Sequence, residues 1–151
     1  MKADIDLKEK LLARCIAIKE ESEANTLAAM NEAQQAANEY GPPKDRYDSF
    51  RAQLMRKRDM LAQQLASVEE ELRFLRQFRQ GSMSTKVELG ALVILESQML
   101  YILAGIGKVE IEGSLVYVVS PVVPLVAAMQ GLKKGDSFVF RGTAMRIVDI
   151  C

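Results

Sequence analysis

The sequence predicts an α+β protein in which an antiparallel two-helix coiled coil precedes a small β-rich domain. Residues 1–80 are rich in Ala, Gln, Glu, Leu and Arg, which favour helix. Residues 81–151 are rich in Val, Ile, Leu and Gly and contain β-branched runs such as Val116-Tyr117-Val118-Val119. Gly41-Pro42-Pro43 interrupts the helical part near its middle, because proline lacks the N–H group that a helix requires. The two helices therefore run in opposite directions.

Composition excludes several classes of protein. The 20 basic residues equal the 20 acidic residues, so no net charge points to nucleic acid or to a membrane surface. The absence of histidine excludes imidazole metal sites and catalytic triads with a histidine base. No apolar run approaches the ~18 residues of a membrane span. Cys15 and Cys151 lack metal-ligand spacing and are expected to be free thiols in a reducing, cytoplasmic compartment.

The first helix is predicted from near Asp6 to Glu39. Asp4 or Asp6 can cap it, and Glu9 follows Asp6 at the spacing of a capping box. The stripe of apolar residues is thin between Lys19 and Thr26. The positions expected in the seam are Leu12, Ile16, Leu27, Met30 and Ala37.

The second helix has a clearer coiled-coil period. Asp45 is well placed as its N-cap, against the alternative that Asp45 is a functional carboxylate. The apolar side chains recur in steps of three, four or seven, as in a coiled coil. They are Tyr47, Phe50, Leu54, Leu61, Leu65, Val68, Leu72 and Leu75.

Charge supports the antiparallel pairing. The segment 20–39 carries acidic residues and no basic ones. A bend centred on Pro42 places this segment against the bases of the second helix, namely Arg46, Arg51, Arg56, Lys57 and Arg58. The same register makes Lys10, Arg14 and Lys19 face Glu69, Glu70 and Glu71.

The second domain is predicted to be an antiparallel sheet with one helix, joined to the hairpin by Gly81-Ser82-Met83-Ser84. Ser120 is expected to cap that helix, with Pro121 at its first position, and Gly131 to end it after Met129. Gly90 marks a bulge or a bend. The strands are expected at 87–89, 92–95, 100–103, 108–112, 115–119, 138–140 and 145–150.

The C-terminal residues resemble the bacterial Gre family of transcript cleavage factors. The resemblance is carried by Gly90-Ala91-Leu92-Val93, Ser120-Pro121, Gly131-Leu132-Lys133-Lys134-Gly135-Asp136 and Met145-Arg146-Ile147-Val148-Asp149-Ile150. These segments are similar, in order and character, to the glycine-plus-strand opening, the serine-proline helix, the glycine-lysine-lysine turn and the final strand of the family. Over residues 1–80 only the architecture is similar.

The resemblance implies an FKBP-like fold for residues 81–151 and RNA polymerase as the partner. In the family, the C-terminal domain docks on the rim of the polymerase's secondary channel and the coiled coil enters the channel. Ser120 and Pro121 become candidates for the docking face. The resemblance implies that the chain has no catalytic residue and no cofactor of its own. It also implies that acidic residues at the tip help to hold a Mg²⁺ ion shared with the polymerase.

At the tip the sequence departs from the family motif, which is glycine, acid, two residues, then acid-Asn-Ala-acid-Tyr. An alignment on Tyr47 puts Tyr40 and Pro43 at the metal-associated acids and Arg46 at the acid before the tyrosine. An alignment on Gly41 puts Pro42 at the first acid. The nearest carboxylates are Glu39, Asp45 and Asp48, and we expect weak or absent stimulation of cleavage.

Two of the candidate groups have structural interpretations. Asp48 suits the first turn of the second helix, where the helix dipole favours an acid. The bases Arg46, Arg51, Arg56, Lys57 and Arg58 could contact RNA or DNA phosphates, or pair with the acids of the first helix. Tyr40, beside the bend, has no obvious core to enter.

Three functions from different classes follow. The first is a polymerase-binding regulator that is not itself an enzyme. The second is a peptidyl-prolyl isomerase, which the implied fold suggests. It requires an aromatic-lined pocket from Tyr101, Tyr117, Phe138 and Phe140. The third is a structural or chaperone-like coiled coil that grips clients at its tip, although residues 41–48 are polar and charged. The sequence leaves the oligomeric state open.

Overall fold

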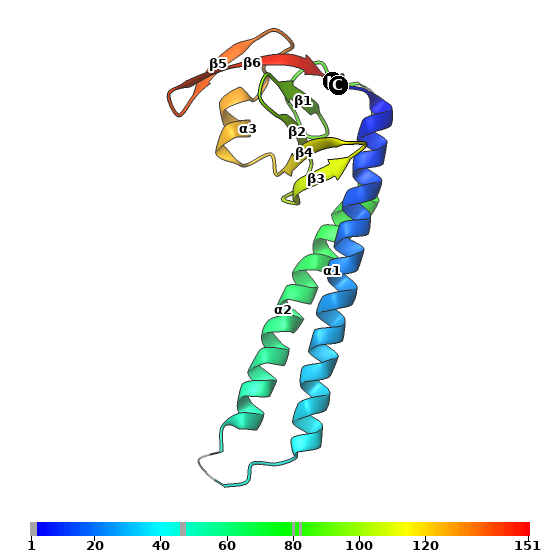
Figure 1. Ribbon diagram of the computed structural model, residues 1–151, viewed down its shortest axis with the longest axis vertical. Coiled ribbons are helices and arrows are strands. Elements are labelled where there is room, and N and C mark those ends of the chain that lie inside the picture. The colour runs from blue at the N-terminus through cyan, green and yellow to red at the C-terminus, as the bar shows by residue number, and fades with distance from the viewer. Residues whose placement is uncertain (1–2, 46–47, 80, 82) are drawn as a thin grey trace. The chain divides into compact units, whose positions relative to one another are not determined.

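The computed structural model describes residues 3–45, 48–79, 81 and 83–151, and its architecture is α+β, as predicted (Figure 1). Within these residues the helices are α1 (Ile5–Tyr40), α2 (Phe50–Gln77) and α3 (Pro124–Met129). The strands are β1 (Leu92–Leu95), β2 (Met99–Ile102), β3 (Gly107–Ile111), β4 (Ser114–Val119), β5 (Ser137–Phe140) and β6 (Thr143–Ile150). No helix of the described chain is long and apolar enough to cross a membrane.

The chain divides into two compact units. The β-rich unit contains the residues up to Cys15 together with Phe78–Cys151, and the hairpin unit is Ile16–Gln77. The first residues of α1, which were predicted to be part of the coiled coil, therefore belong to the β-rich unit.

The β-rich unit contains one six-stranded sheet in the order β3-β4-β2-β1-β6-β5. All neighbouring strands are antiparallel except β2 and β4, which are parallel, so the sheet is mixed where a purely antiparallel one was expected. Residues 87–89 are not a strand. Gly90 follows them at a φ of +89°, which favours glycine. A side chain there would also approach the Phe78 ring to 3.1 Å.

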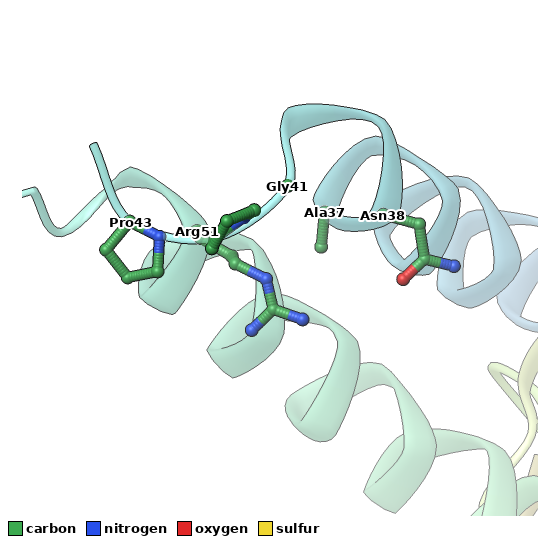
Figure 2. Close-up of a pocket in the computed structure, with 6 residues that line it drawn as sticks. Ala37, Asn38, Gly41, Pro43 and Arg51 are labelled. Atoms are coloured by element: carbon green, nitrogen blue, oxygen red, sulfur yellow. The ribbon is translucent and has the colours of Figure 1, made fainter.

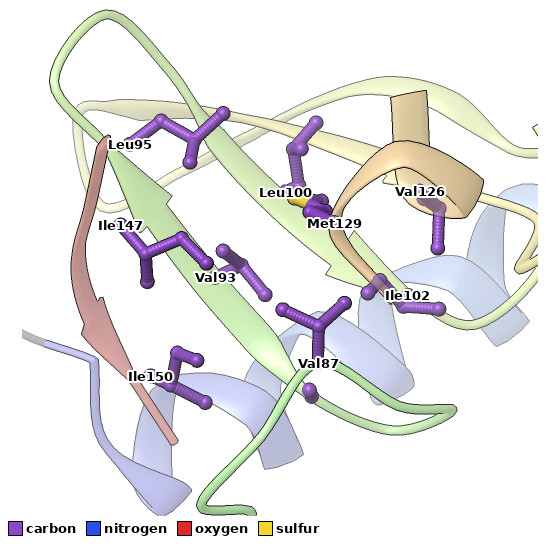
Figure 3. Packing of buried hydrophobic residues seen from close by; sticks show 10 residues of the cluster. Val87, Val93, Leu95, Leu100, Ile102, Val126, Met129, Ile147 and Ile150 are labelled. Atoms are coloured by element: carbon purple, nitrogen blue, oxygen red, sulfur yellow. The ribbon is translucent and has the colours of Figure 1, made fainter. Parts of the chain in front are cut away.

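The core of this unit lies between the sheet and α3 (Figure 3). Val93 of β1, Ile102 of β2 and Ile147 of β6 are fully buried and point toward Val126 and Met129 of α3. The continuous apolar runs of β1 and β2 are typical of strands covered on both faces. Cys15 and Cys151 are both buried and form no disulfide, as expected.

Polar contacts attach the start of α1 to the end of β6. The Asp4 carboxylate accepts the Leu7 N–H at 2.7 Å, so Asp4 is the N-cap of α1. The Ala3 N–H donates to Asp149 Oδ2 at 3.1 Å. Lys8 is fully buried, and its Nζ donates to the Cys151 carbonyl at 2.9 Å.

Helix α3 begins three residues later than predicted, at Pro124 instead of Pro121. Val123 precedes a proline and adopts an extended conformation, with φ −67° and ψ 148°, because the proline ring clashes with a helical residue before it. Ser120 caps no helix. Its Oγ accepts the Val122 N–H at 3.3 Å in the turn before α3.

In the hairpin unit, α1 and α2 face each other through a heptad seam. In α2, buried and half-buried apolar residues recur in steps of three and four, except for one step of seven that spans Arg58. These residues are Leu54, Leu61, Leu65, Val68, Leu72 and Leu75. The inward positions of α1 in this unit follow the same period: Ile16, Lys19, Glu23, Thr26, Met30, Ala33 and Ala37. Polar residues therefore occupy the middle of the α1 stripe. The prediction that Leu27 and Phe50 lie in the seam is wrong, because 42% and 50% of their surfaces are exposed.

The register of the hairpin differs from the predicted one. Arg58 donates to Gln34 Oε1 at 2.6 Å. Lys19 pairs with Glu71, as expected, and Glu20 pairs with Arg76 at 3.4 Å. The sequence midpoint of the Arg58–Gln34 pair is residue 46, and that of the Lys19–Glu71 pair is residue 45. The predicted midpoint was Pro42. The bend is wider than predicted because α2 begins only at Phe50. Lys10, expected to face the acids of α2, pairs instead with Asp6 and with Glu112 of the β-rich unit.

Candidate functional site at the hairpin turn

The turn between α1 and α2 is ordered around one carboxylate, that of Asp48. Asp48 Oδ2 accepts hydrogen bonds from the Tyr40 hydroxyl and from the Lys44 N–H, the latter at 2.8 Å. Asp48 Oδ1 accepts the Phe50 N–H at 3.1 Å. Asp48 was predicted to lie in the first turn of α2. That prediction is wrong, because α2 begins at Phe50 and Asp48 precedes it. Asp48 closes the turn by joining the end of α1 to the start of α2.

These hydrogen bonds shift the acidity of both side chains. The Lys44 N–H, followed by the Tyr40 hydroxyl, lowers the pKa of Asp48 below its usual value. The same bond to Asp48 raises the pKa of Tyr40. Donors that stabilise the charged carboxylate favour its ionised form. Asp48 is therefore an anion at neutral pH, with donors on both of its oxygens.

Tyr40 has a structural role at the turn. Its ring contacts Phe50, with the centroids 4.9 Å apart and the planes tilted by 60°. Lys44 Nζ lies 4.8 Å from the centre of the Tyr40 ring and donates to the Tyr40 carbonyl at 3.1 Å. The small aromatic cluster and the cation together cover the end of α1, where a positive charge is favourable.

The other two tip carboxylates do not join Asp48. Glu39 is exposed and accepts a hydrogen bond from Gln35 Nε2 at 3.1 Å. Asp45, predicted as the N-cap of α2, lies five residues before the helix, and its carbonyl accepts the Asp48 N–H at 3.2 Å. Among the described residues, no group of three or more Asp, Glu, Cys or His side chains is placed to hold a metal ion.

A Mg²⁺ site of the turn's own does not fit this donor set. Mg²⁺ requires near-octahedral oxygen ligands and is usually held by one or two carboxylates together with waters and substrate phosphates. Asp48 already accepts three donors, and neither Glu39 nor Asp45 completes a set with it.

A hollow of about 400 Å³ opens beside the turn, lined by Ala37, Asn38, Gly41, Pro42, Pro43 and Arg51 (Figure 2). Gly41 ends α1 at a φ of +80°. The half-buried Arg51 extends from α2 into the space between the loop and the last turn of α1.

The predicted basic residues separate into three environments. Arg51 lines the hollow, whereas Arg56 and Lys57 are exposed on α2. Arg58 occupies the seam position between Leu54 and Leu61 and bonds Gln34 and Asp59, so it is a structural residue. Arg46 lies outside the described residues, as does Tyr47.

The docking candidates Ser120 and Pro121 lie in the β-rich unit, in the turn before α3. Both are half-buried. The neighbouring Val122 has 83% of its surface exposed. A single exposed aliphatic side chain is ordinary on a protein surface and does not by itself indicate an interface.

Sequence reasoning missed the pairing of Tyr40 with Asp48 and the position of Arg58 in the seam. A signal for the first was present, because an aromatic residue that directly precedes Gly-Pro-Pro lies within reach of an acid at the far side of the turn. The seam position of Arg58 follows from counting in steps of three and four between Leu54 and Leu61.

Comparisons with known proteins give structural neighbours only. No protein-family model matches the chain, and no curated protein does. The crystal structure of GreA factor homolog 1 (Gfh1) of Thermus thermophilus has 18% identity and a TM-score of 0.34, over 90% of this chain and 94% of that one. A structure of the transcription factor Gfh1 has 19% identity and a TM-score of 0.36, over 89% and 92%. Thermus aquaticus Gfh1 has 18% identity and a TM-score of 0.33, over 89% and 92%. Values this low assign neither a family nor a function.

Proposed function

We propose that this chain is a Gre-like regulator of transcription elongation that binds RNA polymerase and inserts its helical hairpin into the secondary channel. The observation that carries the proposal is the antiparallel pairing of α1 and α2 around a polar, internally bonded turn. The Gre-like sequence segments of residues 87–150 support it. The protein acts in the cytoplasm as a regulator and is not itself an enzyme.

The turn works by occupying the channel and not by delivering a metal ion. Asp48, whose carboxylate bonds Tyr40, Lys44 and Phe50, is used to hold the turn closed. Such a turn blocks access to the polymerase active site without supplying ligands to it. The expected net effect is slower elongation with little or no transcript cleavage.

Docking is assigned to the turn before α3 in the β-rich unit. Ser120 fixes that turn by accepting the Val122 N–H, and Val122 offers an exposed aliphatic group beside Pro121. Arg56 and Lys57, exposed on α2, are the groups of the hairpin best suited to contact RNA or DNA phosphates inside the elongation complex.

Binding to purified bacterial core RNA polymerase tests the proposal. The chain is expected to bind at micromolar concentration in low salt. Val122→Asp is expected to weaken binding at least about tenfold, since a buried interface charge costs well over 1 kcal/mol. Leu115→Asp is the matched control, because Leu115 is also an exposed aliphatic residue of the β-rich unit, on β4. Absence of binding by the unmodified chain would overturn the proposal.

A cleavage assay on stalled elongation complexes tests the mechanism. The chain is expected to slow nucleotide addition and to leave the RNA 3′ end uncut. Asp45→Ala should not change this result. Strong cleavage that Asp45→Ala abolishes would show instead that the tip supplies a catalytic carboxylate and shares Mg²⁺ with the polymerase.

The two other functions receive no support from the structure. A peptidyl-prolyl isomerase requires an open aromatic pocket, but Tyr101 is fully buried and Tyr117 and Phe138 pack against the core. A client-binding tip requires a broad apolar surface. The described part of the turn is largely polar, and its aromatic pair, Tyr40 and Phe50, is engaged in an internal contact.

A further inference from the structure

The hollow beside the hairpin turn contains a cation that the fold leaves without a partner. We call this space the tip hollow, and its lining residues are Ala37, Asn38, Gly41, Pro42, Pro43 and Arg51. In the described part of the turn, the side chains of Glu39, Lys44 and Asp48 each make a hydrogen bond. Arg51 makes no hydrogen bond and no ion pair with any described residue. Its guanidinium is therefore available to a group from outside the chain.

The walls of the tip hollow are formed before any partner arrives. The Gly41-Pro42-Pro43 segment has little conformational freedom, because both proline rings restrict the backbone. Three hydrogen bonds to Asp48 hold the rest of the turn. Arg51 extends into the space between the loop and α1, and Asn38 lines the same space (Figure 2). The volume of about 400 Å³ lies in the range of ligand-binding clefts.

The lining of the tip hollow suits an acidic side chain. Among the described residues that line it, Arg51 is the only charged one. A guanidinium pairs with a carboxylate through two parallel hydrogen bonds. The proline rings and the buried methyl group of Ala37 offer apolar contacts to the aliphatic stem that carries the carboxylate. The half-burial of Arg51 strengthens such a pair, because less water competes for the charge.

The charge of the turn argues against a nucleic-acid strand as the occupant. Residues 39–51 carry three acidic and three basic residues, so this end of the hairpin has no excess of positive charge. Nucleic-acid backbones bind where several cations neutralise consecutive phosphates. The tip hollow offers one cation, Arg51, and no matching row of charges. A single carboxylate from a protein matches it.

Insertion of the hairpin into a protein channel removes water from Arg51. A charge that is buried without a counter-charge is costly, and the described turn supplies no counter-charge to Arg51. We infer that an Asp or Glu side chain of the polymerase enters the tip hollow and forms an ion pair with Arg51, an inference that rests on the polymerase-binding function proposed above. The Asn38 carboxamide is placed to donate a further hydrogen bond to a group in the hollow. The pair fixes the position of the inserted turn.

Binding of the intact chain to core RNA polymerase without nucleic acid tests this inference. Arg51→Gln is expected to weaken binding about tenfold or more, because it leaves the polymerase carboxylate unpaired. Arg51→Glu is expected to bind more weakly still, since it sets two carboxylates against each other. The turn should persist in both variants, because Arg51 makes no bond within the described fold. Unchanged amide resonances of Lys44 and Phe50, which donate to Asp48, check this.

Arg73→Gln is the matched control. It removes the same charge from an exposed position of α2, about six helical turns from Arg51, and should leave binding unchanged. The inference is overturned if Arg51→Gln binds as well as the unmodified chain or if Arg73→Gln weakens binding equally. It is also overturned if Arg51→Glu binds no more weakly than Arg51→Gln, because the partner group is then not an anion.

A parallel measurement on elongation complexes separates a carboxylate from a phosphate. Arg51→Gln is expected to weaken binding to core polymerase and to elongation complexes alike. A loss confined to the elongation complexes would overturn the inference, because it assigns Arg51 to a phosphate of RNA or DNA. Absence of polymerase binding by the unmodified chain would overturn the proposed function itself, and this inference with it.

Discussion

The hairpin unit and the β-rich unit differ in what holds them together. The β-rich unit has a core of fully buried aliphatic side chains, among them Ile102 and Ile147. In the hairpin, the α1 side of the seam is polar at Lys19, Glu23 and Thr26, and the turn is joined by hydrogen bonds to Asp48. Apolar burial is read easily from sequence runs. A polar seam depends on individual side-chain pairs that a pattern does not specify.

The largest expected difference comes from matched truncations. Ile102→Ala in the β-rich core should cost about 2–5 kcal/mol, the usual range for a buried large-to-small change. Leu65→Ala in the half-buried α2 seam should cost about half as much, because its site is already partly hydrated. Chemical denaturation followed by circular dichroism measures both. Hydrogen exchange assigns each loss to a unit. Equal costs would contradict the contrast between the two units.

A second comparison uses two glycines of the left-handed region. Gly90→Ala combines a φ of +89° with a 3.1 Å approach to the Phe78 ring, and should cost about 2 kcal/mol or more. Gly41→Ala has a similar φ of +80° but open space around it, so about 1 kcal/mol is expected. Thermal unfolding measures the two. A larger loss at Gly41 would show that the turn is packed more tightly than the core edge.

Filling the polar seam should stabilise the hairpin. Thr26→Leu places an aliphatic group at an inward heptad position and is expected to add about 0.5–2 kcal/mol. Asn25→Leu, at the adjacent exposed position, is the control and should add nothing. If both substitutions had the same effect, the assigned seam would be wrong.

The smallest effect is a local dependence of the turn on pH. The pKa of Asp48 is lowered in the folded turn, so its contribution is present above the ordinary value of about 3.9 and is lost as the pH falls from there through the lowered pKa. The pKa of Tyr40 is raised, so its contribution is present below about 10 and is lost as the pH rises through the raised value. Amide resonances of Lys44 and Phe50 report on both transitions.

The control for this titration is Asp48→Asn. It should remove the acid transition from the turn and leave the amides of β1 and β2 unchanged. Persistence of the transition in Asp48→Asn would assign it to another carboxylate.

The sequence predicted most strands of the β-rich unit closely, because their apolar runs end at turns marked by glycine. The prediction from sequence was wrong where two nearby residues could each begin or cap the same helix. Ser120-Pro121 and Val123-Pro124 can each begin a helix, and the extended Val123 selects the second. Asp45 and Asp48 can each precede α2, and the three donors around Asp48 decide between them.

The candidate site was predicted less well than the fold. The bend, its polar character and the mismatch with an acidic pair follow from the order of residues 39–48. The register does not, because a bend that closes by side-chain contacts has no fixed length in the sequence. Arg58 was therefore grouped with the exposed bases although it lies in the seam against Gln34.

The continuity of α1 governs how the protein can be dissected. A fragment that starts at the connector would lack Leu7, Leu11 and Cys15, three buried side chains of the β-rich unit. A fragment that ends at Gln77 would expose the same three side chains to water. Expression of either half alone would then report on a damaged fold, so each half is best studied by substitution within the intact chain.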